Sequence, residues 1–89
     1  MSTRSEVYKA IDGERDYQNS RISNKFGHQP GEHQHPVAAE ILMMEDYIQR
    51  ARKEWTDNKG VVPALHMVRK VAGLAVRCME HHGAPERTQ

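Results

Sequence analysis

The segment PALHMVRKVAGLAVRCMEHHG (residues 63–83) has the clearest helical period in the chain. Pro63 suits the first turn of a helix and Gly83 suits its C-terminal cap, so a helix is predicted over residues 63–82. At about 100° per residue, its polar residues and one glycine fall within a third of the circumference. This polar strip consists of His66, Arg69, Lys70, Gly73, Arg77, Glu80 and His81. The rest of the circumference is apolar, which is more than one neighbouring helix can cover, so the helix is expected to have several partners.

The polar strip carries three permanent cations, Arg69, Lys70 and Arg77, around Gly73, with only Glu80 to balance them. This composition predicts an anion site, in which arginines bind phosphate oxygens with two N–H groups and the lysine adds a point charge. On this interpretation the cations are expendable for stability. The alternative is an ordinary solvated helix face, with Gly73 marking a close helix crossing rather than the approach of a ligand.

A second helix is predicted from Pro36 to about residue 58, where Gly60 follows it. Its apolar residues alternate steps of four and three, the spacing of an antiparallel helix contact. This stripe consists of Val37, Ile41, Met44, Ile48, Ala51 and Trp55. Because the connection over residues 59–62 is short, the helices at about 36–58 and 63–82 are expected to form an antiparallel hairpin.

The N-terminal part predicts a short helix followed by a loop. Thr3 and Glu6 have the spacing of a capping box, and a helix is expected within residues 1–22 despite Gly13. Residues 23–36, SNKFGHQPGEHQHP, hold two glycines and two prolines and are predicted to be a loop. The fold class is therefore all-α, with one small helical domain over residues 1–89.

Three histidines in this predicted loop, His28, His33 and His35, raise the question of a metal site. No second close pair or cysteine set completes a familiar ligand pattern, so the loop is interpreted as solvated and no metal or other cofactor is expected.

Size and charge limit the classes of function. A chain of 89 residues has a marginal core, so assembly into a homo-oligomeric helical bundle is expected. A net charge of +1 argues against a general coat for DNA, RNA or membranes. The single cysteine, Cys78, lies on the apolar side of its helix, and no apolar run approaches the roughly 18 residues that span a bilayer. A soluble, cytoplasmic protein is expected.

In outline the chain resembles the MazG-like all-alpha NTP pyrophosphohydrolases. The matching elements are Arg15 and Gln18, His35 and Pro36, a glutamate-bearing helix at residues 41–55 and a last helix at residues 68–80. The C-terminal part also looks like the endings of small phage-encoded proteins, which suggests a viral origin.

The resemblance implies a nucleotide-sized cavity but not the chemistry of the family. The family's hydrolysis needs carboxylates three or four residues apart on facing helices to hold magnesium. Here Glu40 and Glu45 are five apart, and the last helix offers only Glu80. A binding protein is therefore favoured over an enzyme, with a residual pyrophosphohydrolase using these three glutamates as the second hypothesis.

The leading expectation is capture of a phosphate-bearing nucleotide, such as a cyclic or ADP-ribose-like signal of antiphage immunity, without turnover. Tyr8, Tyr17 or Tyr47 would stack on a base beside the cations, and His66 is a secondary candidate at the edge of the polar strip. A third hypothesis is an adaptor that presents the hairpin to a host protein and binds no small molecule.

Overall fold

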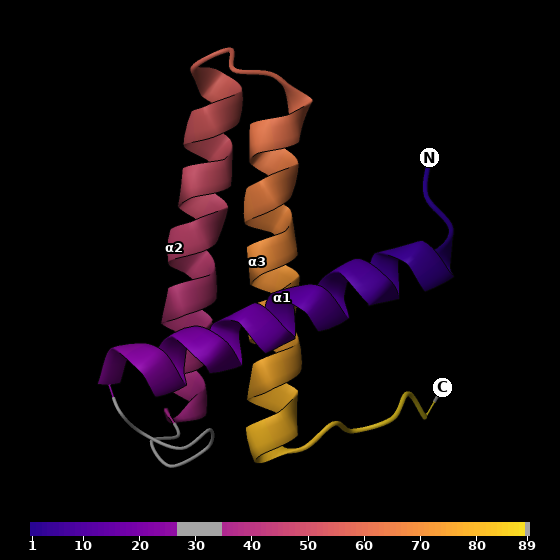
Figure 1. Ribbon diagram of the computed structural model, residues 1–89, viewed down its shortest axis with the longest axis vertical. Coiled ribbons are helices and arrows are strands. Elements are labelled where there is room, and N and C mark those ends of the chain that lie inside the picture. Colours follow the sequence, from indigo (N-terminus) through magenta and orange to yellow (C-terminus); the bar gives the residue numbers. More distant parts are fainter. Residues whose placement is uncertain (27–34, 89) are drawn as a thin grey trace.

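The computed structural model describes residues 1–26 and 35–88, and the side chains of residues 1–20 and 35–88. It contains three helices, α1 (Arg4–Phe26), α2 (Val37–Thr56) and α3 (Val61–His82), and no strand in the described ranges. Helices α2 and α3 run antiparallel, and α1 lies across α3 (Figure 1). The predicted all-α class and helical hairpin are confirmed.

The hairpin turn is built by backbone conformations that suit its residues. Asn58 and Gly60 both have positive φ, 62° and 93°, which asparagine and glycine adopt more readily than other residues. Helix α3 starts at Val61, two residues before the predicted start, because a proline is tolerated anywhere in the first turn, where N–H groups lack helical partners. At the other end, Gly83 donates its N–H to the Met79 carbonyl at 2.9 Å with φ of 115°.

Helix α1 is longer than predicted. Its start is the expected capping box: the Glu6 N–H donates to Thr3 Oγ1 at 3.1 Å, and the Thr3 N–H donates to Glu6 Oε1 at 3.2 Å. The helix continues through Gly13 and through residues 23–26, which the sequence had placed in the loop. Those four residues, SNKF, contain no glycine or proline, so nothing in them obliges the helix to end at residue 22.

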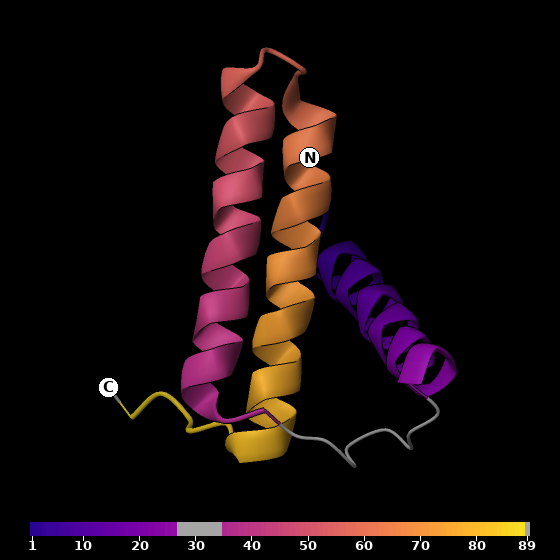
Figure 2. The same cartoon turned by 90° about the vertical axis from the view of Figure 1, so that its left-hand side faces the viewer.

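Three sides of α3 have three different environments. Helix α1 contacts one side and α2 a second, while α1 and α2 do not contact each other within the described residues (Figure 2). Leu74 is the single buried apolar side chain among those described, at 5% exposure, whereas four charged residues are buried. They are Glu14, Arg15, Glu40 and Arg77. The interior of this small fold is therefore held to a large extent by paired charges.

The third side of α3 continues into an exposed apolar surface on α2. We call it the apolar face; it consists of Val37, Ile41, Ile48 and Trp55 on α2 and Val61, Leu65, Val68 and Met79 on α3, each at least 45% exposed. Successive residues of a helix are about 100° apart, so the direction of each stripe follows from the residues that face the neighbouring helix. By this count, the α2 stripe and the α3 stripe both lie on the side of the hairpin opposite α1. The sequence predicted the apolar stripe of α2 as a helix contact. Within the hairpin, most of this stripe stays exposed.

Candidate functional site

An open hollow of about 490 Å³ lies between α1 and α3. Its lining residues come from one face of α1 and from the polar strip of α3: Ala10, Gly13, Glu14, Tyr17, Arg69 and Lys70. Three residues predicted to bind a ligand, Tyr17, Arg69 and Lys70, therefore meet here although the chain separates the tyrosine from the two cations by about fifty residues.

The Lys70 ammonium and the Tyr17 ring form one wall of the hollow. Lys70 Nζ lies 5.7 Å from the ring centroid, within the range of a cation–π contact. Gly13, one helical turn before Tyr17, also lines the hollow, and a Cβ at this position would meet no atom within 4 Å. The wall thus offers a cation and an aromatic face to the same volume.

Arg69 is held at the hollow by contacts on two sides. Its Nε donates to Glu14 Oε1 at 2.9 Å, and its NH1 lies 2.6 Å from His66 Nδ1. Because a guanidinium can only donate, His66 Nδ1 is the acceptor in this contact. The Arg69 side chain remains 34% exposed, so part of the guanidinium is available at the surface.

Gly73 marks the crossing of α1 over α3. A Cβ at this position would lie 2.7 Å from Glu14 Cγ and 2.8 Å from Gln18 Nε2. The glycine therefore allows the close approach of two helices, which is the structural alternative left open by the sequence.

Alanine at Gly13 and at Gly73 should distinguish the effect of helix packing on stability from the effect of helix propensity. We expect Gly73→Ala to lower the melting temperature, because Glu14 and Gln18 must move away from the new methyl group. Gly13→Ala is the matched control and should raise the free energy of unfolding by up to about 1 kcal/mol, since its Cβ meets nothing. Thermal unfolding followed by circular dichroism measures both. Equal stabilisation by the two alanines would contradict the assignment of Gly73 to the crossing.

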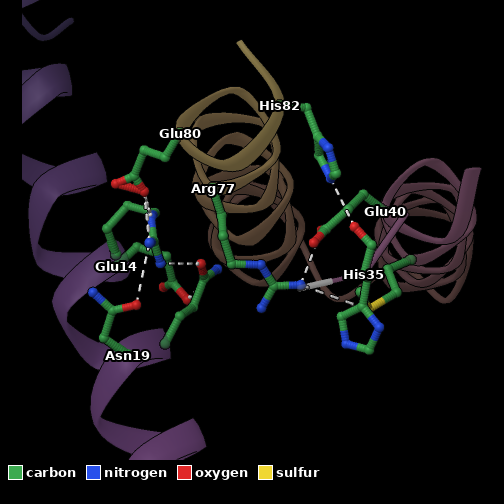
Figure 3. A network of polar contacts seen from close by, with 10 residues as sticks. Glu14, Asn19, His35, Glu40, Arg77, Glu80 and His82 are labelled. Carbon is green, nitrogen blue, oxygen red and sulfur yellow. Dashed lines mark hydrogen bonds and ion pairs between the residues drawn. The ribbon is translucent and has the colours of Figure 1, made fainter. Parts of the chain in front are cut away.

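Arg77 lies outside the hollow and makes a buried ion pair with Glu40 of α2 (Figure 3). Arg77 NH2 lies 2.9 Å from Glu40 Oε2, and the two side chains are 8% and 0% exposed. Glu40 Oε1 and Arg77 Nε are buried without a hydrogen-bond partner among the described residues. This burial argues against the expectation that Arg77 is expendable for stability. Arg77 thus differs from Arg69 and Lys70, which line the open hollow.

A third ion pair joins α1 to the C-terminal part of α3. Arg15 NH2 lies 2.6 Å from Glu80 Oε2, and Arg15 Nε donates to the same oxygen at 2.7 Å (Figure 3). Arg15 NH1 also donates to Gln18 Oε1, and NH2 donates to Asn19 Oδ1. Nothing in the sequence predicts a role for Glu14, and Arg15 stands out only with Gln18 as one element of the MazG-like resemblance. No local signal identifies them, because α1 has no apolar stripe to show which of its sides faces α3.

The other candidates lie away from the hollow. Tyr47 is half-buried on α2 with the Arg50 guanidinium 4.9 Å from its ring centroid. His82 Nε2 contacts the His35 carbonyl at 2.7 Å, while His28 and His33 fall outside the described residues. In the part of the chain that the structure describes, no three His, Cys, Asp or Glu residues are grouped so that they could hold a metal ion.

No family model, curated protein or solved structure matches the chain. The resemblance to the MazG-like enzymes and to phage-encoded proteins therefore stays a prediction. Among the described helices, none combines the length and apolar content that crossing a membrane requires.

Proposed function

We propose that the protein binds a phosphate-bearing nucleotide in the hollow between α1 and α3 and sequesters it without turnover. The observation that carries this proposal is the convergence of Arg69, Lys70 and Tyr17 on one open volume of about 490 Å³. A volume of this size lies within the range of small-molecule sites. The role in capturing a signal of antiphage immunity rests only on the resemblance to phage-encoded proteins.

The chemistry of the lining residues suits a nucleotide. Lys70 and the exposed part of Arg69 provide donors for phosphate oxygens, and charge-assisted hydrogen bonds are the stronger kind. Tyr17 is 49% exposed, so part of its ring surface is open to a base. The phosphate would therefore contact the cations, and the base would contact the aromatic ring beside them.

Binding without turnover is supported by how the acidic residues are used. The hydrolase alternative requires Glu40, Glu45 and Glu80 to share a metal, but Glu40 is buried against Arg77 and Glu80 pairs with Arg15. Glu45 is exposed on α2. Carboxylates already neutralised by arginine are poor ligands for a divalent cation, so we do not propose the hydrolase function.

We also propose that the apolar face joins copies of this chain. Eight large apolar side chains at heptad-like spacing on both hairpin helices form a surface like half of a four-helix bundle. Large contiguous apolar patches of this kind mark interaction surfaces. The adaptor hypothesis uses the same surface for a host protein, and the oligomeric state of the purified chain distinguishes the two.

Calorimetric titration against linear and cyclic nucleotides tests the proposed function directly. We expect at least one nucleotide to bind, and Arg69→Ala to weaken its binding by about one to two orders of magnitude, since a charge-assisted hydrogen bond contributes about 1.5–3 kcal/mol. Arg69→Lys should also weaken binding, because lysine keeps the charge but loses the planar pair of donors. Chromatography of the ligand recovered after the titration should show it unchanged.

Arg50→Ala provides a control for the loss of one arginine, because Arg50 is exposed on α2 and lies outside the hollow. The Arg50→Ala variant should bind the nucleotide with the same affinity as the unmodified protein. A dissociation constant of about 100 μM corresponds to a binding free energy of about −5.5 kcal/mol. If no nucleotide binds with a dissociation constant below this value, the adaptor hypothesis replaces the nucleotide-binding proposal.

A further inference from the structure

Glu14 is an unexpected component of a site for an anion. Its carboxylate is 5% exposed and lines the hollow beside the two cations. A carboxylate so close to a phosphate repels it, and a buried charge also loses its hydration. Because Glu14 would weaken the binding of an anion by repulsion, its presence at this position indicates a different role.

The contacts of Glu14 indicate that role. One carboxylate oxygen accepts from Arg69 Nε at 2.9 Å, and the other accepts from Gln18 Nε2 at 3.4 Å. Because Gly73 has no side chain, the Glu14 side chain lies directly against α3, where its carboxylate reaches Arg69. Glu14 therefore contacts Nε of the Arg69 guanidinium, while His66 contacts NH1.

We infer that Glu14 is a positioning residue that holds the Arg69 guanidinium in its phosphate-binding orientation. An arginine loses several rotamers when it binds a ligand, and this entropic cost falls if the free protein already holds the side chain in place. The inference rests on the proposed phosphate site. It predicts that removal of a negative charge from the hollow weakens the binding of an anion, whereas simple electrostatics predicts tighter binding.

The test is an NMR titration with inorganic phosphate, followed through backbone amides and the Arg69 Nε–H signal. Glu14→Met retains the Cγ atom that lies against Gly73 but cannot accept from Arg69, and it should weaken phosphate binding by about tenfold. Glu14→Gln lacks the charge but keeps an oxygen acceptor. Its affinity should lie within about threefold of the unmodified protein, and its Arg69 Nε–H signal should keep its position.

Glu80→Met is the matched control, since it removes the carboxylate of the other ion pair between α1 and α3 without touching the hollow. It should bind phosphate at least as well as the unmodified protein. Equal weakening by Glu80→Met would show that Glu14 acts only by docking α1, and tighter binding by Glu14→Met would show that it is a competing charge. Either result overturns the positioning role of Glu14 but leaves the proposed phosphate site in place. A lack of phosphate binding by the unmodified protein up to about 50 mM would overturn the proposed function as well.

Discussion

Arg77→Ala is expected to lower the free energy of unfolding by about 3–5 kcal/mol. Glu40 is 0% exposed beside Arg77, and the substitution leaves neither of its oxygens paired to a cation. A buried, uncompensated carboxylate is among the costliest defects in a small fold, whose total stability is about 5–15 kcal/mol. Chemical denaturation followed by circular dichroism measures the change.

Two further variants make this prediction specific to the buried pair. The double variant Glu40→Met, Arg77→Met should recover most of the lost stability, because an apolar pair of similar volume avoids burying any charge. Arg50→Ala breaks an exposed ion pair with Asp46, whose side chains are 58% and 56% exposed, and should change stability by less than about 1 kcal/mol. If Arg77→Ala is no more harmful than Arg50→Ala, or if the double variant is the least stable, the Glu40–Arg77 pair does not hold α2 against α3.

A single charge in the apolar face should disrupt the proposed assembly. We expect the unmodified protein to sediment as more than one chain at about 10 μM and Val68→Glu to sediment as a folded monomer. The reason is that assembly would place an unpaired carboxylate in a dry contact, at a cost of several kcal/mol, or more than a hundredfold in the association constant. Analytical ultracentrifugation measures the mass, and circular dichroism checks that the helices remain.

Leu42→Glu is the control for this experiment. Leu42 is 64% exposed on α2, more than Val68, but it lies roughly 100° or more around the helix from the apolar face. Its glutamate variant should assemble like the unmodified protein. A monomeric unmodified protein, or dissociation caused by both substitutions alike, would mean that the apolar face does not join copies of the chain.

The helices and the hairpin, apart from the end of α1, could be predicted from the sequence because their signals are local. The Thr3–Glu6 capping box, the period of residues 63–82 and the cap at Gly83 each depend on residues within a turn or two of one another. The composition of the polar strip likewise predicts an anion site that includes Arg69 and Lys70. Both residues line the hollow, and their binding of a ligand stays a prediction.

Which charges are buried and which stay exposed depends on contacts between helices. The partners of Arg77, Arg69 and Arg15 lie 37, 55 and 65 residues away in the chain, on helices whose docking sides the local pattern does not show. An arginine on a polar helix strip has the same sequence pattern whether it meets water, a phosphate or a distant carboxylate. Only the crossing of α1 at Gly73 and the pairing of α2 with α3 assign Arg77 to the interior and Arg69 to the hollow, because burial depends on what packs around a side chain.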